Sequence, residues 1–229
     1  MVLTKAQCAR FLLTALCITL LWSGITNAEE QSFSEQVGDG IIINDSKFVR
    51  YPRERSESVY VVPDGITTIA ADAFAYCDIV EVYIPEGVTM IGASAFKGCI
   101  FLEKVHLPES LLVISNSAFS YCTQLSDIDL PPNLYAIGNY AFSDNWSLQS
   151  VVIPASVSFV GHGAFSNSSI IEIRFEGNYL DYVGDHLFTP FEDIYTTIIV
   201  PHEGLYYAER LKEEFRNRKN VLFQCADMP

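Results

Sequence analysis

The apolar positions of this chain recur with a period of 22 to 23 residues from about Glu57 onward. Each unit opens with alternating apolar and polar residues, such as Val82 and Ile84 on either side of Tyr83. An alternation of period two predicts a short strand with one buried face. A proline then ends the strand without loss of a ladder hydrogen bond, because proline has no N–H to donate. The prolines that mark the units are Pro63, Pro85, Pro108, Pro131 and Pro154.

The second half of each unit carries another apolar pattern. Ile91, Ala95 and Cys99 are spaced at four, which favours a helical turn. One coil cannot bury its own apolar face, but stacked coils bury each other's. We therefore expect an internal ladder of the phenylalanines that follow each proline by eleven positions. These are Phe74, Phe96, Phe119, Phe142 and Phe165, with a degenerate copy at Leu187 and Phe188.

The unit Leu-x-x-Val-x-Leu-Pro-x-x-Leu-x-x-Ile-x-x-x-Ala-Phe-x-x-Cys resembles the BspA-like leucine-rich repeat family, also called the Treponema pallidum type. The resemblance covers about residues 57 to 200. It implies a leucine-rich repeat solenoid of right-handed coils, with a parallel β-sheet on the concave face and short helical turns or irregular segments on the convex face. It also implies an extracellular or surface protein that serves in adhesion and protein binding. The last repeats depart from the pattern, since the repeat cysteine becomes Asn145 and then Ser168.

The start of the chain differs from the repeats. Lys5 and Arg10 precede an apolar run of 12 residues, which is followed by small or polar residues up to Ala28. This layout is typical of a secretory signal peptide, and the run is shorter than the roughly 20 residues that a membrane-spanning helix needs. We predict a signal peptide over 1–28 with cleavage after Ala28. A permanent membrane anchor is the alternative.

Three regions follow the predicted signal peptide: an N-terminal flank or cap over 29–56, the solenoid over 57–201, and a cap helix with a tail over 202–229. A cap fits a solenoid, because open sheet ends invite association. The cap helix is predicted from four apolar residues at helical spacing, Leu205, Ala208, Leu211 and Phe215. A helix lying on a membrane surface is the alternative, although glutamates dilute its positive charge.

The chain is acidic, with 14 basic and 28 acidic side chains and a formal charge of −14. Removal of the predicted signal peptide leaves 12 basic side chains and a charge of −16. Nucleic-acid-binding proteins carry a basic patch, whereas Arg174 is the only cation between Lys104 and Arg210. We therefore expect no nucleic-acid partner. We also expect no membrane span after the signal peptide.

Strand side chains that point away from the core are the candidates for function, since side chains alternate faces along a strand. Coils in a parallel stack lie about 4.8 Å apart, so these residues should form one mixed patch. Tyrosine and arginine are enriched at the energetic centres of interfaces, which favours Tyr83 and Arg174 as anchors. The alternative is a solvated sheet face without a ligand. The predicted protein-binding surface consists of Tyr83, Lys104, His106, Asp127, Asp129, Glu172 and Arg174.

Catalytic chemistry has little support in the sequence. No HExxH, paired CxxC, P-loop or GxSxG motif is present, so we predict neither an enzyme nor a cofactor. A divalent metal at His106, Asp127 and Asp129 is a weaker hypothesis. We do not expect the chain's four histidines to converge.

The repeat cysteines Cys77, Cys99 and Cys122 share one inward position and are interpreted as small buried hydrophobes. An exported protein also permits a disulfide, either Cys77–Cys99 or Cys99–Cys122. Cys225 is interpreted as a free thiol.

These observations predict a secreted, periplasmic or cell-surface protein that binds protein partners through its concave face. Host or extracellular-matrix proteins are the expected partners of such an adhesin-like module. The alternative is a periplasmic structural scaffold without a host ligand.

Overall fold

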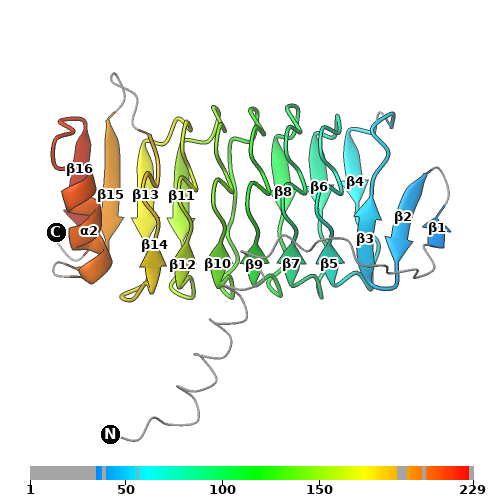
Figure 1. Cartoon of the computed structure of the whole chain (residues 1–229), viewed down its shortest axis with the longest axis horizontal. Helices are drawn as coiled ribbons and strands as arrows, with labels where there is room; N and C mark the ends of the chain where they lie inside the picture. The colour runs from blue at the N-terminus through cyan, green and yellow to red at the C-terminus, as the bar shows by residue number, and fades with distance from the viewer. Residues whose placement is uncertain (1–34, 38–39, 56, 190–194, 203–204, 227–229) are drawn as a thin grey trace, which may run out of the picture. The chain divides into compact units, whose positions relative to one another are not determined.

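A computed structural model describes residues 35–37, 40–55, 57–189, 195–202 and 205–226. The predicted signal peptide, 1–28, lies outside these residues. In the described part, the chain winds into a stack of coils with a helix at its C-terminal end (Figure 1). The predicted solenoid is therefore confirmed.

One side of the coils is built from parallel strands. Three of them, β4 (Val59–Val61), β6 (Glu81–Tyr83) and β8 (Lys104–His106), form one sheet. Four more, β11 (Ser150–Ile153), β13 (Glu172–Phe175), β15 (Thr196–Val200) and β16 (Val221–Cys225), form another. We call these two sheets together the front sheet. The strand β16 was not predicted from the sequence.

The front sheet is interrupted at residues 126–131, which have no assigned strand. The outward residues of this coil are therefore not held by strand pairing, although Asp127 and Asp129 line one cavity with Lys104 and His106. Ile128 keeps its inward place and is only 5% exposed, so the core continues beneath the break. The exposed residues beside it, Asp127 and Asp129, disfavour a strand because aspartate fits poorly on a pleated surface.

A nine-stranded sheet, the back sheet, runs along the solenoid from its N-terminal end. It begins with the antiparallel strands β1 (Glu35–Val37), β2 (Ile41–Asn44) and β3 (Lys47–Arg50). The rest pair in parallel from β3 onward: β5 (Thr68–Ile69), β7 (Met90–Ile91), β9 (Val113–Ile114), β10 (Ala136–Ile137), β12 (Phe159–Val160) and β14 (Tyr182–Val183). Residues 40–50 thus extend the back sheet by a hairpin.

After each back-sheet strand comes a run of turns, which we call the turn segment. In the segment that follows β7, the Ala95 N–H donates to the Gly92 carbonyl three residues earlier. Ser94 has a left-handed backbone with φ of 56°, and its N–H donates to the carbonyl of Asn116 in the next coil. A helix would keep such bonds within itself. The segment is therefore irregular, and the helical turn favoured by the spacing of four does not form.

The predicted phenylalanine ladder is confirmed. Successive rings from Phe74 to Phe165 are nearly parallel, with centroids 4.7 to 5.4 Å apart and interplanar angles of 4° to 6°. The ladder also extends to Phe48 in β3, whose ring lies 4.7 Å from that of Phe74. All five repeat rings are fully buried.

The coils approach one another closely at the glycine after the back-sheet strand. A Cβ on Gly138 would lie 2.5 Å from the backbone nitrogen of Asn116 and 2.6 Å from the carbonyl carbon of Ser115. Real Cβ atoms do not come so near to backbone. The absence of a side chain at Gly138 therefore lets this coil and the preceding one stack at their observed spacing.

The repeat cysteines lie in the core as free thiols, so no disulfide joins Cys77, Cys99 and Cys122. The Cys99 and Cys122 thiols donate to the carbonyls of Phe74 and Phe96, at sulfur-to-oxygen distances of 2.9 and 3.1 Å. Burial raises the pKa of the Cys77 thiol to about 11 and that of Cys99 to about 12. The interpretation as small buried residues is confirmed.

The predicted C-terminal helix is α2 (Tyr206–Glu214). Ala208 and Leu211 are fully buried, and the ring of Phe215, which follows the helix, stacks 4.5 Å from Phe188. The residue that follows the helix thus covers Phe188, the degenerate last copy of the ladder position. In the described ranges, no helix combines the length and apolar character needed to cross a membrane.

Candidate interaction surface

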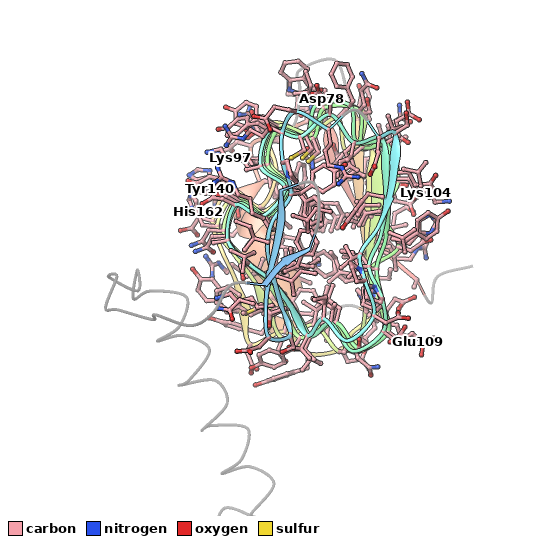
Figure 2. The ribbon with its side chains drawn as sticks, turned by 90° about the vertical axis from the view of Figure 1, so that its right-hand side faces the viewer. Asp78, Lys97, Lys104, Glu109, Tyr140 and His162 are labelled. Carbon is pink, nitrogen blue, oxygen red and sulfur yellow. The ribbon has the colours of Figure 1, made fainter. Side chains whose placement is uncertain are left out.

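Strand pairing brings the outward residues of the front sheet into columns. Within the first sheet, Glu81 is paired with Lys104, and Tyr83 with His106. Within the second, Ser150 pairs with Glu172 and Val152 with Arg174. Figure 2, a view along the coils, shows Lys104 on the opposite side from Tyr140 and His162. We call the outward side chains of the front sheet and of residues 127 and 129 the front surface.

The most ordered part of the front surface is a cluster of Glu81, Tyr83 and His106. The rings of Tyr83 and His106 stack face to face, with centroids 4.0 Å apart and an interplanar angle of 7°. One carboxylate oxygen of Glu81 accepts the Tyr83 hydroxyl at 2.9 Å and lies 2.6 Å from His106 Nε2. Three side chains from two neighbouring coils thus hold one another in place.

The hydrogen bonds of this cluster change its acid–base properties. The bond to His106, followed by the bond to Tyr83, lowers the pKa of Glu81. The same bond to Glu81 raises the pKa of the Tyr83 hydroxyl. Both shifts favour a hydrogen bond between an ionised Glu81 and a protonated Tyr83 hydroxyl.

Glu81 is the functional candidate that the sequence prediction omitted. It stands two residues before Tyr83 on the same strand, and side chains two apart share a face. It also precedes Lys104 in its column. Its strand position and its pairing with Lys104 could have placed Glu81 beside the predicted residues. Its hydrogen bond to His106 could not be predicted, because it joins residues of two different columns and depends on side-chain rotamers.

The middle of the front surface carries carboxylates without partners. Among the described residues, Asp127 and Asp129 make no hydrogen bond or ion pair. They line a shallow cavity of about 140 Å³ together with Lys104, His106 and neighbouring backbone. This part of the surface can accept hydrogen bonds or cations from a partner.

Glu172 and Arg174 form the third part of the front surface. Their side chains lie on the same strand, β13, and form an ion pair with an N-to-O distance of 3.3 Å. Both are 42% exposed, so the pair is screened by solvent and contributes little to stability. Three coil steps of about 4.8 Å separate Arg174 from His106, or roughly 14 Å. Of the seven predicted residues, four share one cavity, and Tyr83 stacks on His106 beside it, whereas Glu172 and Arg174 lie farther along the stack.

A metal at His106, Asp127 and Asp129 is not supported. No group of three or more potential ligands with suitable geometry occurs in the part of the chain that the structure describes. Instead, His106 directs Nε2 to Glu81. Two of the four histidines do meet, since the rings of His162 and His186 lie 5.3 Å apart at 89° on neighbouring coils, but His106 lies away from them on the front sheet.

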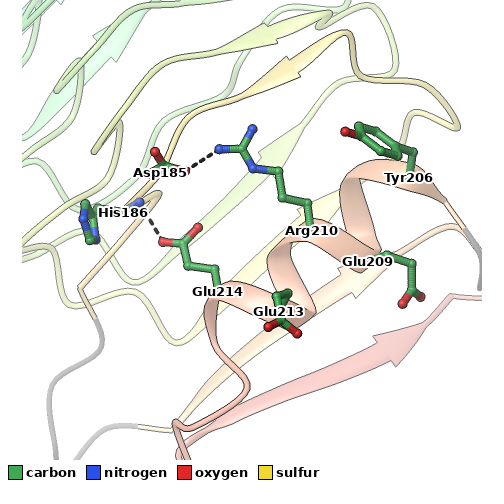
Figure 3. A pocket seen from close by; sticks show the side chains of 7 residues that line it. All are labelled: Asp185, His186, Tyr206, Glu209, Arg210, Glu213 and Glu214. Atoms are coloured by element: carbon green, nitrogen blue, oxygen red, sulfur yellow. Dashed lines mark hydrogen bonds and ion pairs between the residues drawn. The ribbon is translucent and has the colours of Figure 1, made fainter.

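A second hollow, not predicted, lies beside the cap helix (Figure 3). Its volume is about 590 Å³. Glu214 accepts the His186 backbone N–H at 2.6 Å, and Arg210 pairs with Asp185. Burial raises the pKa of Glu214. These contacts attach α2 to the last turn segment, so we assign the hollow to the docking of the cap.

Comparison with protein families gives one match. The family described as BspA type leucine rich repeat region matches residues 58–198 in six copies. A search of curated proteins gives no match.

Solved structures resemble the chain over much of its length. A leucine rich cell surface protein from Faecalibacterium prausnitzii is 29% identical, with a TM-score of 0.58, over 61% of this chain and 38% of its own. The leucine rich repeat protein of T. pallidum is 26% identical, with a TM-score of 0.59, over 87% of this chain and 99% of its own. The pneumococcal vaccine antigen PcpA, at 17% identity and a TM-score of 0.54, shares the fold over 85% of this chain and 48% of its own. The chain thus spans well under half of the first of these relatives.

Proposed function

The chain belongs to the BspA-type leucine-rich repeat family, and from this membership we propose that it is an exported, adhesin-like module that binds a protein partner through its front surface. The similar protein from Faecalibacterium prausnitzii is a leucine rich cell surface protein, which supports export of this chain to the cell surface. The predicted signal peptide over 1–28 agrees with this location.

The observation that carries the proposal is the Tyr83–His106 stack held by Glu81. Protein interfaces concentrate their binding energy in a few aromatic and arginine side chains. Here the two rings are already fixed, with Tyr83 still 38% exposed. Tyr83 and His106 would therefore lose little conformational entropy when a partner binds. The neighbouring Asp127 and Asp129 supply acceptors for the polar rim of the same interface.

Binding rather than catalysis fits these residues. Tyr83 and His106 use their polar atoms on Glu81, and Arg174 uses its guanidinium on Glu172. Nothing in this set resembles a nucleophile activated by a base. The function we propose is recognition of a host or matrix protein.

Charge reversal on the front surface tests the proposal. The double variant Lys104→Glu, Arg174→Glu should reduce capture of a partner from host matrix extracts by at least about tenfold. The reason is that acidic groups of the partner, which the two cations attract, would be repelled by the new glutamates. The matched control is Lys97→Glu, on the turn side of the coil (Figure 2). Quantitative mass spectrometry of the captured proteins measures the difference, and thermal melts verify that all three proteins are folded. Equal capture by the double variant would show that the front surface is not the binding site.

Protease treatment of intact cells tests the location. Cleavage of the protein on unbroken cells is expected for a surface module. Protection until the outer barrier is opened would favour the periplasmic scaffold instead.

A further inference from the structure

The ends of the solenoid are closed to different degrees. At the N-terminal end, the antiparallel hairpin of β2 and β3 extends the back sheet, and at the C-terminal end α2 buries Ala208 and Leu211 while Phe215 stacks on Phe188. In the front sheet, by contrast, β16 is the last strand, and no described residue pairs with its outer edge. This edge is a row of backbone donors and acceptors without strand partners.

The sequence of β16 has none of the features that protect edge strands. Natural edges carry lysine, proline, inward charges or bulges that prevent pairing with another chain. The strand reads Val-Leu-Phe-Gln-Cys from Val221 to Cys225, without charge, proline or glycine. Its pairing with β15 is continuous over five residues and has no bulge. The edge is therefore straight, uncharged and rich in residues that favour strands.

The core beneath β16 is also incomplete. In β15, the inward residues Ile198 and Val200 are at most 1% exposed. In β16, the inward residues Val221, Phe223 and Cys225 pack on the core but remain only partly buried. Apolar side chains at this end of the stack thus still face solvent on one side.

The hydrogen bonds show which backbone groups face outward. The Thr196 N–H donates to the Asn220 carbonyl, and the Ala226 N–H donates to the Val200 carbonyl. Because a parallel strand bonds to each neighbour through alternate residues, the residues bonded to β15 are those at even positions. The N–H and C=O groups of Phe223 and Cys225 therefore point to the open edge.

We propose that a second copy of this chain pairs with β16 along this edge, antiparallel and about a two-fold axis at Phe223. In that register, Phe223 faces the partner's Phe223, and Val221 faces the partner's Cys225. The Phe223 pair exchanges two backbone hydrogen bonds. In each Val221–Cys225 pair the Cys225 N–H donates to the Val221 carbonyl, because the Val221 N–H already donates to the Arg218 carbonyl. The three partly buried side chains of each copy cover one another. The arrangement is self-complementary, as a two-fold interface requires, and it brings no two like charges of β16 together.

A proline on the strand tests the pairing without disturbing the fold. Cys225→Pro removes only an outward N–H and leaves the bonds to β15, because the Cys225 N–H does not face that strand. The matched control, Cys225→Ala, removes the thiol but keeps the N–H. Sedimentation velocity of the purified protein should give twice the mass of one chain for the wild type and for Cys225→Ala, and the mass of one chain for Cys225→Pro. A wild type with the mass of one chain, or a dimer that persists in Cys225→Pro, would overturn the proposal.

A cysteine pair tests the register. In the Val221→Cys variant, the new thiol should lie opposite the partner's Cys225, with Cα atoms about 5.5 Å apart, as in a hydrogen-bonded antiparallel pair. Mild oxidation should then yield a covalent dimer with a 221-to-225 disulfide in peptide maps. Residues 221 and 225 of one chain are too far apart along a strand to join each other. Absence of this disulfide in a dimeric variant would contradict the antiparallel register.

Discussion

The turn segments and the front sheet belong to the same coils, yet their residues are determined by different constraints. On the turn side, each repeat position touches the next coil: the rings stack at 4.7 to 5.4 Å, and Gly138 leaves no room for a Cβ. On the front side, the inward residues also pack between coils, and some outward residues touch the next coil, as Tyr83 touches His106. The residue type of the outward column nevertheless changes from Tyr83 to His106 to Asp129. The repeat pattern therefore records how coils pack, and function is to be sought at the positions on which the pattern places no constraint.

The largest difference between the two sides should appear when a ladder ring is removed. Phe119→Ala deletes a fully buried ring that stacks on Phe96 and Phe142, so it should lower the free energy of unfolding by about 3 to 5 kcal/mol. Tyr83→Ala on the front side should change it by about 0.5 kcal/mol or less. Urea denaturation followed by circular dichroism measures both. Similar losses for the two variants would contradict the contrast.

A smaller effect is expected where the backbones meet. Gly138→Ala adds a methyl group that overlaps the preceding coil, so the free energy of unfolding should fall by about 1 to 3 kcal/mol. The corresponding position one coil earlier, Ser115, already carries a Cβ, and Ser115→Ala is the matched control. Its unfolding midpoint should stay close to that of the wild type. If Gly138→Ala also leaves the unfolding midpoint unchanged, the close contact at Gly138 does not limit the spacing of the coils.

The smallest effect is expected on the front surface and depends on pH. Since the pKa of Glu81 is lowered in the folded protein, its ionised form stabilises the fold above the unfolded pKa, and this contribution is lost as the pH falls through the folded pKa. The midpoint temperature of the wild type should therefore exceed that of Glu81→Gln slightly at pH 7. The two should converge as the pH falls below the ordinary range for glutamate. Thermal melts from pH 7 to pH 3 measure this, and a constant difference would show that Glu81 does not act through its charge.

Much of the fold follows from the sequence because it follows from periodicity. The Phe74 to Phe165 ladder and the pairing of Tyr83 with His106 need only the repeat length and the alternation of strand faces. The turn segments do not follow from it. The spacing of Ile91, Ala95 and Cys99 fits a helix equally well, and nothing in the sequence marks a serine as left-handed, as Ser94 is.

The candidate surface was predictable only in part. The columns of outward residues follow from strand geometry. Which residues of the columns contact one another depends on side-chain rotamers, as in the hydrogen bond between Glu81 and His106. The front sheet is interrupted at Asp127 and Asp129 because aspartate has a weak preference for strands, while Ile128 between them stays packed in the core. The rings of His162 and His186 meet although the two residues are not equivalent, since the pairing of Val160 with Val183 aligns His162 with Asp185.

The stacking of coils also sets the spacing between groups on the front surface in fixed steps of one coil. Each coil contacts mainly its two neighbours, so the gain or loss of one 23-residue unit leaves the remaining contacts intact. It changes the distance between the His106 cluster and Arg174 in increments of about 4.8 Å. Relatives with different numbers of units can thus present the same chemical groups at graded separations, and the fit to a partner can evolve through recombination of whole units without redesign of the core.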